Sequence, residues 1–354
     1  MNIADSDLSI VVQGKVTDYT ASSLKTMRSL FPRAEIILST WENDPIEGLS
    51  FDILVQSADP GGVPYSLTGE CSQINNQNRQ VVSTINGLRK ASRPYVIKVR
   101  TDFTVTKDTI LRNFNSIFHD RDLKYAIFNS RIVTCSLCSR IFSHQTLRPT
   151  PFHPSDIFAF GERNDLLKLW ESVDLASDEE LGFWKCKYPN LVPYADCSWR
   201  YPPEQFIFVK CIEKHYSKVG FDDWTDYDIK NMELSKRLII NNFIILNNFD
   251  IGLESEKHKH TLCDADNGLP GVINCQRFLE FYNDTYQTNF VYNKLFFKTE
   301  NSLEKVNTIN EKVDKINDRL KQEIKVFVSP FKYSFKWMCS ISKFLILSLK
   351  SLMK

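Results

Sequence analysis

Apolar residues occur in short, nearly continuous runs, separated by helix-like segments, over the first hundred residues. Such runs are typical of strands buried on both faces, and they occupy residues 8–14, 34–40, 51–56 and 94–100. Two intervening segments carry apolar residues three and four positions apart, which predicts amphipathic helices over residues 20–30 and 75–91. Repeated strand–helix units with short links predict an α/β fold with a mostly parallel sheet and helices on both faces.

The same patterns continue less regularly in the middle of the chain. We expect strands at residues 125–135 and 157–160, a helix at residues 164–171 and another helix that begins after Pro202. Ligands of parallel sheets bind beyond the carboxyl ends of the strands. The loops that follow the first four predicted strands therefore share one rim, where the chemistry of the protein is expected.

Composition divides the chain into three parts. We expect a catalytic domain over residues 1–250, a polar linker or accessory segment over residues 251–300 and an amphipathic helical tail over residues 301–354. Apolar residues recur every three or four positions within 303–324, which predicts a helix or short coiled coil that could join copies of the chain. Residues 331–354 hold five lysines, no acidic residue and several aromatic residues. This predicts a segment lying in a membrane interface, with a helix docked on the protein or on a partner as the alternative.

Charge and cysteine content narrow the compartment and the partners. The formal net charge is +1, so no global field attracts the molecule to nucleic acid, and no such partner is expected. The nine cysteines are odd in number and scattered, which favours reduced thiols over a disulfide framework. No basic segment precedes the first apolar run, so we expect no secretory signal. The resulting prediction is a cytoplasmic protein, peripheral at the inner face of the cytoplasmic membrane.

The motif Lys98-Val-Arg-Thr-Asp102 ends the fourth predicted strand. A carboxylate at this position lies on the rim of the sheet, where Asp102 could hold Mn²⁺ or Mg²⁺ on a diphosphate. Arg100 lies two residues earlier, on the same face if the strand persists that far. The alternative is that Asp102 caps the following turn.

Two further motifs contain candidates for acid–base chemistry. In Phe152-His-Pro-Ser-Asp156, Asp156 could act as a base or bind the acceptor, and His153 could bind a metal or a diphosphate. The alternative is a turn or cap formed by Ser155 and Asp156. Glu204 follows two prolines at a helix start. It is a candidate general base for an acceptor hydroxyl, but a carboxylate in the first turn of a helix is also favoured electrostatically.

Polar side chains gather at the start of the second predicted helix, in Asn75-Asn-Gln-Asn-Arg-Gln80. Asn78 and Arg79 suit contacts with hydroxyl and phosphate groups, with N-capping as the alternative. Two other polar motifs predict no chemistry. Cys135 and Cys138 form a lone pair without a second matched pair, so we expect structural thiols. Residues 258–260, His-Lys-His, are expected to be a solvated charge run.

Taken in order, six of these segments resemble the WavE lipopolysaccharide synthesis family. They are Ile10-Val-Val-Gln-Gly14, Ala34-Glu-Ile-Ile-Leu-Ser-Thr-Trp-Glu42, Asn78-Arg-Gln80, Lys98-Val-Arg-Thr-Asp102, Phe152-His-Pro-Ser-Asp156 and Pro203-Glu-Gln205. The resemblance extends over residues 8–215. It implies a fold like that of the GT-A glycosyltransferases, a Rossmann-like αβα sandwich, here with a C-terminal helical extension. It also implies a nucleotide-sugar donor and a saccharide or lipid-linked acceptor in the assembly of lipopolysaccharide, O-antigen or capsule.

The resemblance also implies roles for single residues. It would place Gln13 and Gly14 at the nucleotide, and Asp102 where the GT-A class keeps a metal-binding aspartate. The Asp-any-Asp pattern of that class is incomplete here, so Arg100 or a lysine could replace the cation. Asp156 and Glu204 compete for the role of base, with Glu204 preferred.

Two other functions are alternatives at this point. A sugar-nucleotide nucleotidyltransferase uses a similar sheet, but it usually has a glycine-rich phosphate loop near the first strand, which Gln13-Gly-Lys-Val16 is not. A non-catalytic scaffold of the polysaccharide machinery would use residues 303–324 as a docking arm.

Overall fold

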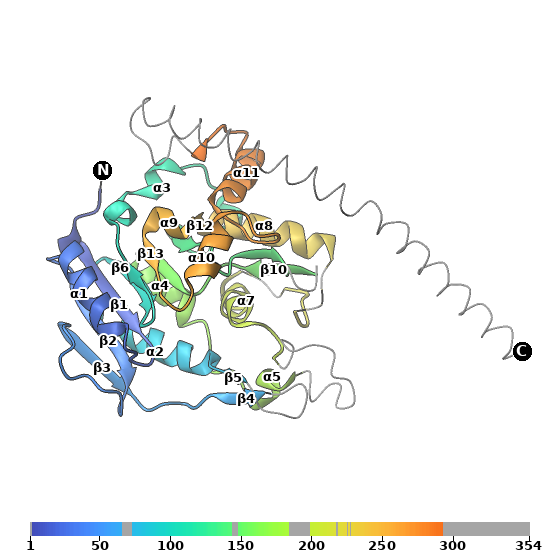
Figure 1. Ribbon diagram of the computed structural model, residues 1–354. Coiled ribbons are helices and arrows are strands. Elements are labelled where there is room, and N and C mark those ends of the chain that lie inside the picture. The colour runs from blue at the N-terminus through green and yellow to red at the C-terminus, as the bar shows by residue number, and fades with distance from the viewer. Residues whose placement is uncertain are drawn as a thin grey trace, which may run out of the picture. The chain divides into compact units, whose positions relative to one another are not determined.

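The computed structural model describes residues 2–65, 73–143, 148–183, 199–216, 219–224, 226 and 228–292 (Figure 1). Residues 1–291 form one compact unit. The predicted helical tail, with the coiled-coil and membrane-interface segments, lies outside the described residues. Among the residues that are described, no helix combines the length and the apolar character needed to cross a bilayer.

A seven-stranded sheet forms the centre of the described unit. Its order is β12-β8-β11-β6-β1-β2-β3, and the neighbouring strands are parallel except that β11 is antiparallel to both β6 and β8. The expected α/β class with a mostly parallel sheet is therefore confirmed. The strands are β1 (Leu8–Gln13), β2 (Glu35–Trp41), β3 (Ile53–Ser57), β6 (Tyr95–Arg100), β8 (Ile132–Cys135), β11 (Phe158–Glu162) and β12 (Phe243–Leu246).

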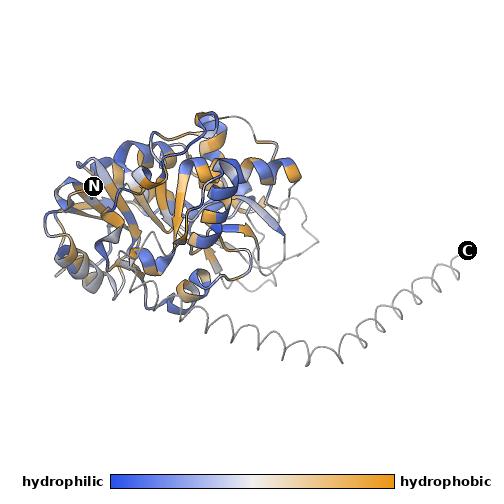
Figure 2. Ribbon diagram, turned by 90° about the horizontal axis from the view of Figure 1, so that it is seen from above, coloured by the Kyte–Doolittle hydropathy of each residue, from blue (hydrophilic) through white to orange (hydrophobic). Residues whose placement is uncertain are grey.

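Helices cover both faces of this sheet. The crossover from β1 through α1 (Thr20–Leu30) to β2 runs in the opposite direction along the sheet to the crossover from β3 through α2 (Gln77–Lys90) to β6. Because parallel crossovers are right-handed, α1 and α2 lie on opposite faces. α2 packs on β1, β2 and β3 and beside α4 (Arg163–Trp170), which packs on β6 and β11. Figure 2 shows hydrophobic residues gathered along the central strands.

Three longer helices belong to the half of the molecule that contains β8 and β12. They are α7 (Pro203–His215), α8 (Ile229–Asn242) and α11 (Cys275–Tyr286), and α11 packs on β12 and α8. The smaller elements are β4 (Val63–Tyr65), β5 (Gln73–Asn75), β7 (Thr104–Val105), β9 (Arg140–Phe142), β10 (Pro149–His153), β13 (Leu253–Glu254), α3 (Phe114–Ile117), α5 (Asp178–Leu181), α9 (Asn248–Ile251) and α10 (Lys259–Asp266).

The strand predicted over residues 125–135 is shorter than expected, because β8 begins at Ile132. Side chains satisfy the backbone before it: Asn242 accepts from the N–H groups of Ile127 and Phe128. The buried guanidinium of Arg131 donates to three carbonyl groups, among them that of Ile240. Backbone groups bonded in this way need no neighbouring strand.

Residues 251–291 belong to the same compact unit as the sheet. β13 pairs with β7, and α10 packs against α9. The division of the chain at residue 250 stays a prediction.

Candidate active site

A cavity of about 690 Å³ opens at the carboxyl ends of β1, β2 and β6. These strands meet where the order of the sheet reverses, since β2 and β6 lie on opposite sides of β1. The register places Gln13 level with Ser39 of β2 and Arg100 of β6. Open α/β sheets bind ligands at such a switch point. The lining includes Gln13, Gly14, Lys15, Trp41, Asp44, Asp59, Arg79, Gln80, Arg100 and Asp102.

The backbone turns sharply at the end of β1. Gly14 has φ +112°, a conformation that side chains disfavour, and a Cβ at this position would lie 3.4 Å from Oγ1 of Thr101. The buried Gln13 side chain accepts a hydrogen bond from Ser83 of α2 at 2.6 Å. This turn leaves the backbone of Gly14 as part of the cavity wall.

Arg100 and Asp102 form a bidentate ion pair in the cavity wall. Nε and one terminal nitrogen of Arg100 donate to the two carboxylate oxygens of Asp102, at 2.9 and 2.6 Å. Burial acts to lower the pKa of Arg100, but the charge of Asp102, the hydrogen bonds to it and the charge of Asp156 together outweigh burial, and that pKa is raised. The Arg100 guanidinium also lies 5.4 Å from the ring centroid of Phe103. The cation and the carboxylate are therefore held against each other.

His258 is the histidine beside Asp102. Its ring stacks on Phe103 at 5.3 Å with an interplanar angle of 6°, and Nε2 lies 3.6 Å from Oδ2 of Asp102. Burial lowers the pKa of His258. The expectation that residues 258–260 are a solvated charge run is thus wrong for His258, because the fold brings it against a side chain far away in the sequence. Sequence spacing carried no signal for this contact.

Two more cations line the cavity. Arg79 pairs with Asp59 through two hydrogen bonds of 2.7 Å and also donates to Asn76. Lys15, which the sequence did not single out, is exposed, and its ammonium group has no hydrogen bond or ion pair to the described part of the chain. It is therefore available to an anionic ligand.

Asn78 is the candidate that the structure separates from the cavity. Its side chain donates to the carbonyl of Ala176 at 2.9 Å and accepts from the Ala176 N–H at 2.8 Å. This pair of bonds ties α2 to the segment after α4. Asn78 is engaged with the protein backbone, whereas the next residue, Arg79, lines the cavity.

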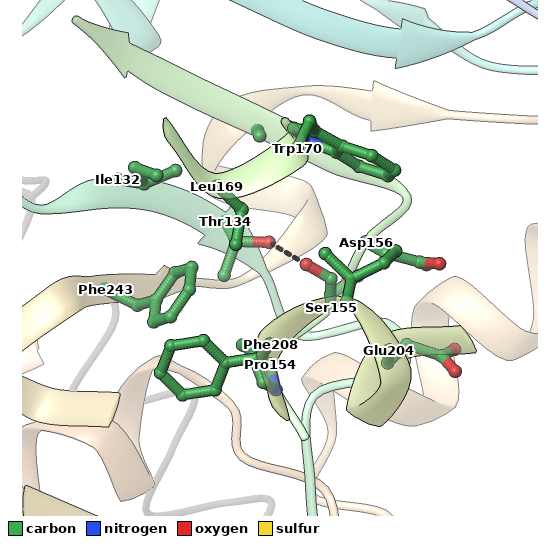
Figure 3. A pocket seen from close by; sticks show the side chains of 12 residues that line it. Ile132, Thr134, Pro154, Ser155, Asp156, Leu169, Trp170, Glu204, Phe208 and Phe243 are labelled. Atoms are coloured by element: carbon green, nitrogen blue, oxygen red, sulfur yellow. Dashed lines mark hydrogen bonds between the residues drawn. The ribbon is translucent and has the colours of Figure 1, made fainter. Parts of the chain in front are cut away.

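Asp156 and Glu204 line a second, smaller pocket, and in Figure 3 their carboxyl groups point to the same side. Asp156 is nine-tenths buried, and Lys98 donates to its backbone carbonyl. Burial, and next the charge of Glu204, raise the pKa of Asp156 to about 6, although Lys98 and Arg100 act in the opposite direction. Burial lowers the pKa of Lys98 to about 8. The pocket thus holds a carboxyl group whose pKa is raised well above its ordinary value.

His153 lies next to Glu204. Its Nδ1 is 2.9 Å from the carbonyl oxygen of Cys138, and its Nε2 is 3.9 Å from Oε2 of Glu204. His153 is buried and does not line the cavity that contains Asp102. The two residues predicted to share a metal ion are thus placed in different surroundings.

Asp156 connects the cavity with the smaller pocket. Gln80 lines the cavity and donates to the carbonyl of Asp156 at 3.4 Å, and Arg100 acts on the Asp156 carboxylate through its charge. The structure therefore gathers Gln13, Gly14, Arg79, Arg100 and Asp102 around one cavity and His153, Asp156 and Glu204 beside it.

The residues around Asp102 do not fit a resident divalent ion. Arg100 occupies both carboxylate oxygens, and within the described ranges no group of three His, Cys, Asp or Glu residues could hold a metal. Magnesium and manganese prefer several oxygen ligands.

Cys135 and Cys138 are free thiols. Burial raises the pKa of Cys135 to about 12 and that of Cys138 well above its ordinary value, mainly because a buried thiolate loses its hydration. Thiols in this state are inert, which agrees with the structural role expected for them.

Solved structures with a similar arrangement share little sequence with this chain. The catalytic domain of Drosophila β1,4-galactosyltransferase 7, in complex with xylobiose, is 8% identical, with a TM-score of 0.24, and 46% of this chain covers 51% of it. The glycosyltransferase GlyE of Streptococcus pneumoniae is 10% identical, with a TM-score of 0.27, and 59% of this chain covers 44% of it.

A third structure is described as a glucose-1-phosphate thymidylyltransferase of Bacillus anthracis with sucrose. It is 9% identical, with a TM-score of 0.29, and 51% of this chain covers 83% of it. This chain thus spans about half the length of the first two of these structures.

No protein with a curated description matches the sequence. The family profile described as WavE lipopolysaccharide synthesis matches residues 8–310, which is most of the chain. This confirms the family that the six sequence segments indicated. The chain belongs to the WavE lipopolysaccharide synthesis family.

Proposed function

We propose that this protein is a GT-A-like glycosyltransferase that moves a sugar from a nucleotide-sugar donor to a saccharide or lipid-linked acceptor in lipopolysaccharide synthesis. One observation carries the proposal. A cavity at the switch point of the sheet, lined by Lys15, Arg79 and Arg100, adjoins a pocket that holds Asp156 and Glu204. A cavity that can offer basic side chains to a diphosphate thus lies next to a pair of carboxyl groups able to act as a base.

The cavity suits the donor in size and in chemistry. Its volume of about 690 Å³ lies within the range of about 300–1,000 Å³ usual for ligand sites. Lys15 and Arg79 can face the diphosphate, and Trp41 and Gly14 offer an apolar surface and backbone to the nucleoside. Because the ammonium group of Lys15 has no partner among the described residues, it can bind phosphate without first breaking an ion pair.

Glu204 is the group that would accept the proton of the acceptor. The acceptor hydroxyl oxygen attacks the anomeric carbon as its proton passes to the Glu204 carboxylate. The bond from that carbon to the diphosphate oxygen breaks, and the nucleoside diphosphate leaves with the electron pair. Its negative charge is balanced by Lys15 and Arg79. Asp156 remains next to Glu204, and its carboxyl group contributes to the electrostatic potential around the Glu204 carboxylate.

A requirement for Mn²⁺ or Mg²⁺ stays a prediction. The pairing of Asp102 with Arg100 gives it no support, and the cations of the cavity can carry the neutralising role. Donor turnover compared in a chelator and in added Mn²⁺ decides between the two.

The acceptor and the location follow from the family and from the tail. A family of lipopolysaccharide synthesis supports a saccharide acceptor carried by a lipid. The lysine-rich residues 331–354 would hold the enzyme, as a peripheral cytoplasmic protein, at the membrane where such an acceptor resides. Capsule or O-antigen assembly is a narrower form of the same proposal.

A nucleotidyltransferase fits the same cavity less well. It would bind its phosphates with free N–H groups in the loop after β1. Here the N–H of Val16 is bound by Asp44 at 2.8 Å, so that the loop is held by the protein itself. A non-catalytic scaffold would not need the carboxyl groups of Asp156 and Glu204 beside the cavity.

Nucleotide-dependent thermal shifts test the proposal first, and hydrolysis of a panel of nucleotide sugars tests it further. We expect at least one nucleoside diphosphate to raise the melting temperature and its sugar derivative to be hydrolysed. Lys15→Ala should weaken binding of that nucleotide, whereas Lys90→Ala, at the exposed end of α2, should not. A wild-type protein that neither binds nor hydrolyses any member of the panel would overturn the proposed activity.

A further inference from the structure

Strained backbone surrounds His153. Among the described residues, three other than glycine have positive φ, and two of them are Cys138 at 67° and Phe152 at 57°. Cys138 supplies the carbonyl that bonds to His153, and Phe152 directly precedes it. Phe152 is fully buried, and its N–H donates to Ser235 at 2.6 Å. Such conformations persist where the surrounding structure fixes them, and they concentrate at ligand sites.

The backbone carbonyl of Cys138 determines which ring nitrogen of His153 carries the hydrogen atom. A carbonyl oxygen can only accept, so Nδ1 must donate to the carbonyl of Cys138. Burial, and then the charge of Arg140, lower the pKa of His153 to about 3, so the ring is neutral. Nε2 therefore presents a lone pair and no hydrogen.

That lone pair faces another acceptor. Nε2 lies 3.9 Å from Oε2 of Glu204, which is beyond hydrogen-bond distance. Glu204 has no hydrogen-bond partner in the described part of the chain. Two acceptors that face each other without a donor are complementary to a group that brings donors to both.

One hydrogen-bond donor, the side chain of Arg140, lies beside His153. Arg140 is opposite His153 in the β9–β10 pair, and its Nε is buried without a hydrogen-bond partner in the described ranges. A guanidinium here disfavours a metal ion between His153 and Glu204. Two acceptors with one donor match the mixed donor and acceptor character of sugar hydroxyl groups.

We propose that Nε2 of His153 and the carboxylate of Glu204 bind two neighbouring hydroxyl groups of the acceptor saccharide. This rests on the proposed function and assigns its acceptor site. His153 holds one hydroxyl, and the adjacent hydroxyl is thereby placed against Glu204. The fixed imidazole selects the hydroxyl that reacts.

Two substitutions of His153 separate its nitrogens. His153→Asn retains a donor where Nδ1 lies, and hence the bond to Cys138, but removes Nε2. His153→Gln places an amide oxygen near the position of Nε2. The probes are methyl β-D-galactopyranoside and methyl β-D-glucopyranoside, with cyclohexanol as a control that has one hydroxyl. Binding is followed by NMR on protein labelled with ¹⁵N at histidine, which also reports the tautomer.

We expect His153 Nε2 to resonate as an unprotonated nitrogen and to shift with at least one glycoside but not with cyclohexanol. Loss of one such hydrogen bond should weaken glycoside binding about threefold to tenfold in His153→Asn, with much less change in His153→Gln. A protonated Nε2, a signal unmoved by either glycoside, or equal binding by His153→Asn would overturn the assignment. So would a signal that responds to Mn²⁺ instead of sugar.

Failure here is distinguishable from failure of the proposed function. The nucleotide shifts of the wild-type protein report on the donor cavity without any acceptor. A protein that binds a nucleotide and hydrolyses its sugar derivative but fails the glycoside test would support the proposed function with an acceptor site elsewhere.

Discussion

At the scale of single residues, most charges of the site are already paired. Arg100 is held by Asp102 and Arg79 by Asp59, each through two hydrogen bonds. Glu204 differs, because it has no hydrogen-bond partner among the described residues. A carboxylate left free beside a buried histidine is available to a substrate, and this sets it apart from carboxylates that stabilise the fold.

Glu204→Gln tests the role of base. The amide keeps the shape of the side chain but cannot take up the acceptor proton, so we expect kcat for sugar transfer to fall about 100- to 10,000-fold. Nucleotide thermal shifts should change little, because Glu204 does not line the donor cavity. Glu213→Gln, on the same helix but paired with Lys210, is the matched control and should retain activity. Equal losses in both variants would contradict the role.

Asp156 makes stability depend on pH. Its pKa is raised in the folded protein, from 3.8 to about 6, because burial penalises the charged form. The folded state then binds more protons than the unfolded state between these values, so the free energy of unfolding falls as pH rises through this window. In Asp156→Asn this fall should be absent. Melting temperatures of both proteins from pH 4 to pH 8 test this; parallel curves would contradict it.

At the scale of elements, α2 approaches the sheet more closely than an ordinary helix. A Cβ on Gly87 would lie 2.4 Å from Cγ1 of Val11 and 3.0 Å from Cβ of Ser39. The glycine thus permits the contact that brings Ser83 to Gln13 and Arg79 and Gln80 to the cavity.

Gly87→Ala should therefore destabilise the protein, although alanine favours helices by about 1 kcal/mol. Overpacking against Val11 costs about 1–3 kcal/mol, so we expect a net loss in the free energy of unfolding. Urea denaturation measures it, with Lys90→Ala on the exposed end of the same helix as control. A Gly87→Ala protein more stable than wild type would show that α2 can move away from β1 without cost.

At the scale of the whole molecule, the described unit contains the fold and the candidate site, and the basic tail adds a proposed membrane contact. Anionic lipid attracts a lysine near its surface by about 1 kcal/mol each. Five lysines with interleaved aromatic residues over residues 331–354 would thus bind a membrane that the remainder of the chain, with a formal net charge of −4 (+1 less the +5 of this segment), would not.

A chain that ends at Val328 tests this contact. We expect it to leave the membrane fraction while nucleotide binding persists, because the cavity lies within residues 13–102. The full-length variant with Lys336, Lys343 and Lys350 changed to glutamate should behave similarly, since it loses the charge but retains the length. Membrane association of the shortened chain at the wild-type level would exclude the tail as the anchor.

Much of this architecture follows from local patterns. Continuous apolar runs in the sequence indicate buried strands, and the right-handed crossover between parallel strands then places their carboxyl ends on one rim. For this reason the sequence sufficed to bring Gln13, Arg100 and Asp102 to one cavity. The sequence did not distinguish Asn78 from Arg79 at the start of α2. Successive residues of a helix point in directions about 100° apart, so Asn78 faces away from the cavity while Arg79 faces it.

Tertiary structure alone decided which charges are paired and which remain available. Contacts such as Asp102 with His258, or His153 with Cys138, join residues whose distance in the sequence encodes no mutual signal. Burial, which sets the titration of Asp156, is likewise a property of everything packed around a side chain. The sequence by itself determined the sheet, its rim and the family; the packing of distant segments determined the chemical state of the groups placed there.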